Sequence, residues 1–231
     1  MPAAPVQRLI AKAYADERRR LIDPDRAQNI AEVPAGIPYA HPHARRVPEG
    51  DTCYFCAADR DGMVVSLIQS IYHDFGSAVI GGDTGIILQN RGAFFALDEQ
   101  HPNHLRPGKR TFHTLIPALL MHDGKPYLAF GSMGGEGQPQ AQAALATRII
   151  DFGYDVQQAI EAPRWLMGRT WGTPSRNMSL EGRISDEVVR ELKRRRQPVQ
   201  MVTDWNDIWV THTSFKSIVF SASWKEVRTC G

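Results

Sequence analysis

An abrupt change of pattern at residue 52 constrains the fold of this chain more than any other feature. The preceding residues are rich in proline. From Thr52 the sequence becomes TCYFCAADRDGMVVSLIQS, in which two strand-like runs flank Arg60-Asp61-Gly62. An Asp-Gly pair between alternating apolar residues is the strongest short signal for a β-hairpin. The sequence therefore predicts a hairpin that opens at Thr52.

A threonine at the first position of a buried strand has a specific chemical use. If the peptide bond before Thr52 is cut, the freed α-amino group lies beside the threonine hydroxyl and can act as its base. The alternative is that Thr52 only begins a strand, as β-branched residues commonly do. The stretch by itself leaves both interpretations open.

Further strand-like runs occur after the hairpin. The apolar run at residues 85–90 is typical of a short buried strand, and Asp123-Gly124 between two apolar runs predicts a second hairpin. The strands expected beyond the first hairpin therefore cover residues 85–90, 112–121, 127–130 and 199–202.

Helical patterns occupy much of the remaining sequence. Apolar residues at helical spacing predict one amphipathic helix from Pro5 to Leu21, and a flexible proline-rich linker follows it to residue 49. Three later helices are expected at residues 138–152, after the N-cap Asp155 and after the N-cap Ser185. Hairpin strands combined with a block of helices indicate an α+β layered domain.

Composition and charge narrow the possible functions. The 231 residues are 42% hydrophobic with a net charge of +2, which indicates one ordinary globular domain with no call for nucleic acid. Cys53 and Cys56 fall on opposite faces of a strand and the histidines form no spaced set, so we expect no metal and no cofactor. The chain as given has no signal peptide and no apolar run of membrane-spanning length, which favours a cytoplasmic protein without a membrane partner.

An ordered series of motifs runs through most of the chain. The motifs are GDT at residues 50–52, DRDG at 59–62, TGIILQNRG at 84–92, PGKR at 107–110, DGKPYLAFGSMGG at 123–135 and APR at 162–164. In this order they resemble the small-subunit portion of the γ-glutamyltranspeptidase family, within the N-terminal nucleophile (Ntn) hydrolases. The resemblance implies a four-layer αββα sandwich, which we expect to be incomplete in this chain.

The resemblance also divides the chain into three parts. Residues 1–51 resemble the end of the family's large-subunit portion, residues 52–207 resemble the small-subunit catalytic portion, and residues 208–231 form a tail that departs from the family pattern. Family proenzymes cleave themselves before the threonine, which implies a cut between Asp51 and Thr52. The expected partner is therefore the large-subunit segment of the same proenzyme.

The resemblance assigns catalytic roles to four residues. Thr52 corresponds to the nucleophile, and Ser70 stands where the family keeps a threonine whose hydroxyl orients it. Gly134 and Gly135 match the glycine pair whose backbone N–H groups hold the oxyanion. For Ser70, a strand serine without a catalytic role is the open alternative.

The sequence departs from the family at the positions that bind the acyl donor. Tyr72 stands in place of an asparagine, and Phe94 in place of the acid that pairs with the ammonium of a γ-glutamyl group. His113 and Thr114 stand in place of two serines. Arg91 and His113 can instead bind the carboxylate of a glutaryl or other acyl donor, or they are a surface charge and a loop histidine.

Residues and resemblance together predict a self-cleaving amidohydrolase. It would hydrolyse or transfer the γ-glutamyl group of glutathione-like donors, or a related acyl amide, through an ester on Thr52. One alternative is a cephalosporin or glutaryl acylase. Another is an inactive fragment that keeps part of the fold.

Overall fold

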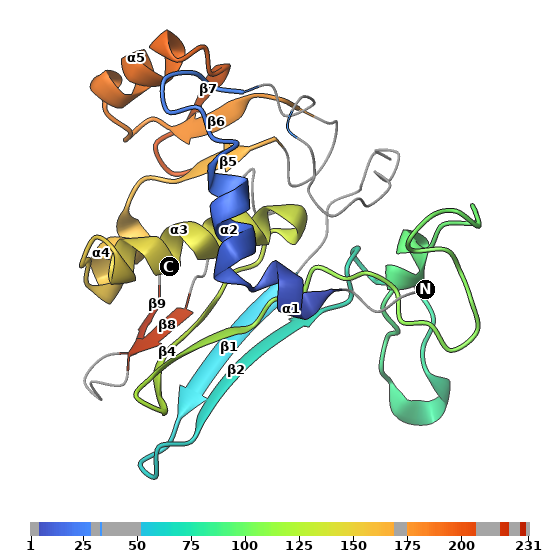
Figure 1. Ribbon diagram of the computed structural model, residues 1–231. Helices are drawn as coiled ribbons and strands as arrows, with labels where there is room; N and C mark the ends of the chain where they lie inside the picture. Colours follow the sequence, from blue (N-terminus) through green and yellow to red (C-terminus); the bar gives the residue numbers. More distant parts are fainter. Residues whose placement is uncertain are drawn as a thin grey trace.

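The fold combines helices with three β-sheets (Figure 1). The computed structural model describes residues 5–28, 33, 52–168 and 175–206, and the backbone of residues 218–221 and 227–229. One sheet is the hairpin of β1 (Thr52–Ala58) and β2 (Val64–Ser70). The second has the order β3-β4-β8-β9 and the third the order β5-β6-β7. Their strands are β3 (Ala118–His122), β4 (Lys125–Gly131), β8 (Ile218–Ser221), β9 (Val227–Thr229), β5 (Trp165–Met167), β6 (Met178–Glu181) and β7 (Val199–Val202).

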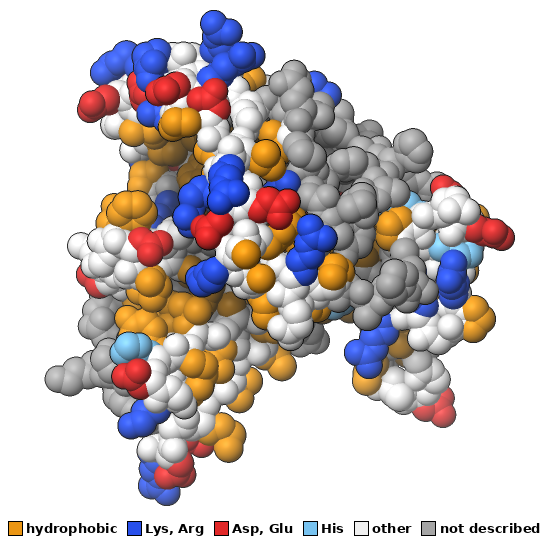
Figure 2. Space-filling model, viewed as in Figure 1, with side chains coloured by type: hydrophobic (Ala, Val, Ile, Leu, Met, Phe, Trp, Pro, Cys, Tyr) orange, Lys and Arg blue, Asp and Glu red, His pale blue; other side chains and the backbone are white. Residues whose placement is uncertain are grey.

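The hairpin predicted to open at Thr52 is confirmed. β1 and β2 are antiparallel, and their register pairs Thr52 with Ser70 at the open end. Side chains alternate between the two faces as the pleat requires, so that Thr52 and Tyr54 are buried while Cys53 and Phe55 are exposed. Figure 2 shows hydrophobic side chains gathered along the exposed face of the hairpin. Those that the solvent reaches include Phe55, Val65 and Leu67.

The buried face of the hairpin packs on the second sheet. A Cβ placed on Gly131, the last residue of β4, would lie 2.3 Å from Cδ2 of the Tyr54 ring. Glycine therefore lets the ring lie directly on the backbone of β4. The Tyr54 hydroxyl is 2.8 Å from Oγ of Ser66, which donates to the carbonyl of Ala118 in β3 at 2.8 Å. These contacts fix β1 over the end of β4.

Two helices cover the opposite face of the second sheet. They are α3 (Gln138–Ile150) and α4 (Val156–Glu161), and α4 begins with the predicted cap, because the Asp155 side chain accepts from the backbone N–H of Gln158. Leu128 and Phe130 of β4 pack with Leu145, Ala159 and Ile160 of these helices to form the main core. The hairpin, the sheet and the helices are successive layers of the predicted αββα sandwich.

The third sheet lies on the other side of α3 (Figure 1). Its connection to α3 is direct, since both amide atoms of Gln140 bond the backbone of Met167. α5 (Asp186–Arg194) precedes β7 and begins at the predicted cap, with the Ser185 side chain accepting from the N–H of Val188. β7 itself covers the predicted residues.

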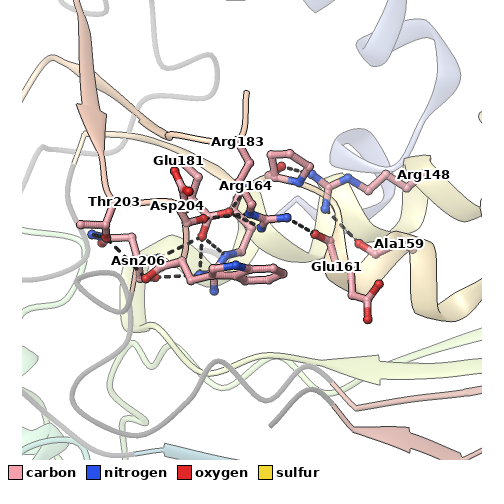
Figure 3. A network of polar contacts seen from close by, with 11 residues as sticks. Arg148, Ala159, Glu161, Arg164, Glu181, Arg183, Thr203, Asp204 and Asn206 are labelled. Carbon is pink, nitrogen blue, oxygen red and sulfur yellow. Dashed lines mark hydrogen bonds and ion pairs between the residues drawn. The ribbon is translucent and has the colours of Figure 1, made fainter. Parts of the chain in front are cut away.

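A buried charge network ties the third sheet to the chain beyond it (Figure 3). The Glu181 side chain is fully buried and forms ion pairs with Arg164 and Arg183. Its carboxylate also accepts from the backbone N–H of Arg164 at 2.9 Å and of Asn206 at 3.2 Å. Arg183 donates in addition to the carbonyl of Glu161, at the end of α4. The Glu181 carboxylate thus connects the residues before β5, the residues after β7 and, through Arg183, the end of α4.

Three predicted elements differ from the structure. The single helix expected from Pro5 to Leu21 is two, α1 (Val6–Leu9) and α2 (Lys12–Arg19), because Ala11 is extended and no residue of either helix is buried to hold them in line. The strand expected at residues 85–90 is wrong. Only an isolated bridge from Ile80 to Ile87 forms there, inside a tight loop that leaves Ile86 exposed. The strand expected from residue 112 begins at Ala118.

Other expectations concern residues that are only partly described. Asp51 and most of the proposed linker lie outside the described residues, as does most of the segment from 208 to 231. Within that segment the backbone of β8 pairs antiparallel with β4, and β9 pairs with β8. No helix in the described part of the chain combines the length and apolar character that a membrane crossing requires.

Candidate active site

Two hydroxyl groups meet at the open end of the hairpin. The Thr52 Oγ1 donates a hydrogen bond of 3.0 Å to Oγ of Ser70, its cross-strand partner. The same Ser70 oxygen accepts from the backbone N–H of Tyr72 at 3.0 Å. Thr52 is only 7% exposed, so the orientation of its hydroxyl is set by this contact rather than by solvent. The structure thus brings together the two residues proposed as nucleophile and orienting group.

The glycine pair lies in the loop that follows β4. Gly134 and Gly135 are buried and have φ of 114° and 48°, values in the left-handed region that favours glycine. A short 3-10 helix, η3 (Gly135–Gly137), connects the pair to the start of α3. The N–H groups in the first turn of a helix lack partners within the helix and can bind an anionic oxygen. The loop directly follows Gly131, on which the Tyr54 ring of β1 packs.

The proposed donor-binding residues form a cluster around Tyr72. The ring centroid of Phe94 lies 4.5 Å from that of Tyr72, and the Arg91 guanidinium carbon lies 5.2 Å from it. The Arg91 Nη1 donates to the hydroxyl of Thr114 at 3.1 Å, and both side chains are buried. Four of the predicted residues, which come from distant segments, therefore lie in contact: Tyr72, Arg91, Phe94 and Thr114. The cluster adjoins Ser70, whose hydroxyl accepts a hydrogen bond from the backbone N–H of Tyr72.

His113 lies apart from this cluster. Its side chain is exposed, and its Nδ1 accepts from the backbone N–H of Leu115 at 3.2 Å. This geometry is that of a loop histidine, which was one of the two open interpretations. The role of His113 in binding a carboxylate is a prediction that the described contacts leave without support.

Burial sets the charge state of several groups near the site. Burial raises the pKa of Tyr54 to about 12, so the phenol stays neutral and is no base for Thr52 near neutral pH. Burial also lowers the pKa of the His73 imidazole, against the opposing effect of Asp74. Burial lowers the pKa of the Arg91 guanidinium as well, but a guanidinium remains charged in proteins. Arg91 is therefore a buried cation.

Several buried polar atoms around the site have no partner among the described residues. They are Nε and Nη2 of Arg91, Nε2 of His73, Oγ of Ser132 and both amide atoms of Gln138. No motif or resemblance in the sequence assigns a role to His73, Ser132 or Gln138. The sequence did offer one signal for two of them. Ser132 and Gln138 are polar residues on either side of the glycines that connect β4 to α3. Buried polar atoms are nearly always hydrogen-bonded in proteins, so such a group indicates a place for a ligand or water.

A metal site has no support within the segments that the structure describes. There, no group of three or more histidine, cysteine, aspartate or glutamate side chains is arranged to hold an ion. Cys53 and Cys56 are free thiols on different faces of β1.

The fold has two packed β-sheets, a threonine at the first position of β1 and a layer of helices behind the sheets. These features define the Ntn-hydrolase class of fold. The chain belongs to the γ-glutamyltranspeptidase family, because the family model described as gamma-glutamyltranspeptidase matches residues 1–223. The predicted family and fold are therefore confirmed. The family match extends beyond residue 208, into the segment expected to depart from the pattern.

Curated relatives place the chain more closely. It is 49% identical over 198 residues to the glutathione hydrolase-like YwrD proenzyme of Bacillus subtilis, covering 85% of this chain and 37% of that protein. It is 45% identical over 190 residues to the oxamate amidohydrolase proenzyme of Klebsiella pneumoniae, covering 82% of this chain and 36% of that protein. The chain thus spans a little over a third of the length of these relatives.

Solved structures agree with the fold. The cephalosporin acylase from Bacillus halodurans matches with a TM-score of 0.71 and 35% identity, over 95% of this chain and 35% of that protein. An acivicin-inhibited γ-glutamyltranspeptidase matches with a TM-score of 0.58 at 20% identity, over 73% of this chain and 88% of that chain, which supports the fold alone.

Proposed function

We propose that this chain is the catalytic portion of an amidohydrolase that cleaves itself between Asp51 and Thr52. The Thr52 hydroxyl attacks the carbonyl carbon of an amide and gives its proton to the freed α-amino group of Thr52. The carbon–nitrogen bond then breaks, and the proton passes to the departing amine. Water next attacks the ester on Thr52, releases the acid and restores the hydroxyl.

The 3.0 Å bond from the Thr52 hydroxyl to Ser70 carries this proposal. It supports a hydroxyl held in one orientation at the first position of a strand, where a cut directly before it would supply the base. Gly134 and Gly135 provide the backbone donors for the oxyanion, a contribution worth about 3 kcal/mol for each donor. Residues 1–51 and the large-subunit portion of the proenzyme are the proposed partners of residues 52–207.

The proposed donor is an amide whose acyl group carries a carboxylate. γ-Glutamyl amides such as glutathione are the first candidates, in agreement with the name of the Bacillus subtilis relative. Acyl donors without an amino group are the second candidates, as for an acylase. The aromatic contact of Phe94 with Tyr72 favours the second, because a phenyl ring offers no charge to an ammonium group. The Klebsiella pneumoniae relative is named for oxamate, an amide of this second type.

Mass spectrometry of Thr52 variants tests the nucleophile. The chain is expressed alone and joined to a large-subunit segment of a family member. We expect two pieces split before residue 52 for the joined wild type and for Thr52→Ser, and one intact piece for Thr52→Ala. The matched control Thr147→Ala removes an exposed hydroxyl on α3 and is expected to cleave as the wild type does.

Two results contradict the proposal. Cleavage before residue 52 in Thr52→Ala would show that another group performs the cut. An intact joined wild type would favour the inactive-fragment alternative.

A further inference from the structure

Arg91 holds a free pair of hydrogen-bond donors inside the site. Its side chain is 4% exposed, and only Nη1 is occupied, by the hydroxyl of Thr114. Nε and Nη2 are buried and have no partner in the part of the chain that the structure describes. The Nε–H and Nη2–H bonds lie on one edge of the planar guanidinium and point the same way. Two parallel donors on one edge match the two oxygens of a carboxylate.

A buried cation without a counter-charge is strongly unfavourable, so its retention needs a reason. None of the described side chains in contact with the Arg91 guanidinium carries a negative charge. The guanidinium lies over the ring of Tyr72, which attracts a cation through its face but offers the free edge no acceptor. The hydroxyl of Thr114 is a neutral partner. The Nε and Nη2 edge of Arg91 is therefore suited to bind an anionic ligand.

The charge count favours a carboxylate over a phosphate. Arg91 contributes one positive charge, and burial lowers the pKa of the neighbouring His73, which keeps that imidazole neutral near pH 7. His73 also stacks on the ring of Tyr72, with the two ring centroids 4.2 Å apart. A single fork-shaped cation pairs well with one planar monoanion.

The charges of the neighbouring side chains also indicate what the ligand does not carry. Phe94 lies against Tyr72, and Phe112 meets Phe94 edge-on with the centroids 5.2 Å apart. Tyr72, Phe94 and Phe112 carry no carboxylate that could pair with an ammonium group next to the ligand's carboxylate, and that group would face the guanidinium charge. Like charges in a buried site repel strongly. The cluster therefore suits an acyl group with a carboxylate and no amino group.

The free edge is connected to the nucleophile through a short series of contacts. Arg91 lies over Tyr72, the Tyr72 N–H donates to Ser70, and Ser70 accepts from Thr52. Tyr72 is buried and has φ of 79°, a conformation that a bulky residue adopts only where its surroundings impose it. The strained turn thus fixes the distance between the cation and the reacting hydroxyl.

We propose that the Nε and Nη2 edge of Arg91 binds the free carboxylate of the acyl donor, and that the donors are monoamides of short dicarboxylic acids without an amino group. This inference rests on the proposed function, in which Thr52 takes up the acyl group. Arg91 is then a specificity-determining residue that contacts the substrate.

Three p-nitroanilides test this assignment, because they differ only in the groups at issue. Glutaryl anilide has the carboxylate, γ-glutamyl anilide has the carboxylate and an ammonium, and pentanoyl anilide has neither. For the joined wild-type protein we expect kcat/KM to be about 100-fold higher for glutaryl than for pentanoyl anilide, as for one buried hydrogen-bonded charge pair. Glutaryl anilide should also exceed γ-glutamyl anilide.

Two Arg91 variants separate carboxylate binding from a merely structural role. Arg91→Met should reduce the glutaryl-to-pentanoyl ratio to within about tenfold of unity, and Arg91→Lys should give an intermediate ratio, since a lysine supplies charge without the fork. A structural role would lower both rates together and leave the ratio at its wild-type value, which would overturn the assignment.

A binding measurement separates this inference from the proposed function. Glutarate should raise the thermal midpoint of the wild type and not that of Arg91→Met, whereas pentanoate should raise neither. If glutarate binds but no anilide acylates Thr52, the proposed function fails and the subsite stands. If the anilides are hydrolysed without preference for glutaryl, or if glutarate produces no shift, the subsite is wrong while the nucleophile is judged by its own test.

Discussion

Replacing Glu181 by alanine should destabilise this protein more than any exposed charge substitution. The carboxylate is fully buried and is shared by Arg164 and Arg183, whose side chains are themselves 14% and 21% exposed. It also accepts two backbone N–H groups, those of Arg164 and Asn206. Removing one member of such a buried network leaves the other charges unpaired and costs about 3–5 kcal/mol.

Thermal unfolding followed by circular dichroism measures this loss. For a chain of this size 1 kcal/mol lowers the midpoint by about 2–4 °C, so Glu181→Ala should lower it by roughly 6–20 °C. Glu191→Ala is the matched control, because that carboxylate pairs with Arg194 and Arg195 on the exposed side of α5. Exposed pairs contribute little to stability. Equal midpoints for the two variants would refute the reasoning that burial makes the Glu181 network important.

The remaining predictions concern the hairpin. Ser70→Ala should lower kcat of the joined protein by about 5- to 150-fold, because the buried Thr52 hydroxyl is left without its partner at a cost of about 1–3 kcal/mol. Ser70→Thr should keep most of the rate, and steady-state kinetics of both variants decide this. Gly131→Ala should lower the free energy of unfolding by about 1–3 kcal/mol in a urea titration, since the new methyl group would overlap the Tyr54 ring. Gly92→Ala is its control, with nothing within 4 Å of the added Cβ, and similar losses in both would contradict the packing argument.

Local signals in the sequence were sufficient for the elements that depend on neighbouring residues. The turn at Asp61-Gly62 and the caps at Asp155 and Ser185 place the first hairpin, α4 and α5 correctly. The failures are elements that depend on distant partners. Residues 85–90 have strand-like composition, but a strand needs a neighbour to pair with, and only Ile87 finds one.

In the candidate site, too, contacts between neighbouring strands could be predicted from the sequence, whereas contacts through loops could not. Thr52 and Ser70 could be predicted together because one hairpin register joins them. The contact of Arg91 with Thr114 joins residues 23 positions apart through a loop, and no periodic pattern encodes it. Gln138 is buried with no side-chain partner among the described residues, and this too is a property of packed elements that a sequence pattern does not reveal.

The alternation along β1 has a practical consequence for following this protein in solution. Cys53 is adjacent to Thr52 in sequence, yet its thiol lies on the exposed face of the hairpin while the threonine hydroxyl lies on the buried face. Burial raises the pKa of Cys56, which slows its reaction with thiol-directed reagents. In a Cys230→Ser background, a maleimide fluorophore would therefore attach at Cys53. If the proposed cut before Thr52 takes place, the dye would report the release of the upstream segment from one residue away, through a change in polarisation. It would lie on the opposite face of the hairpin from the Thr52 hydroxyl.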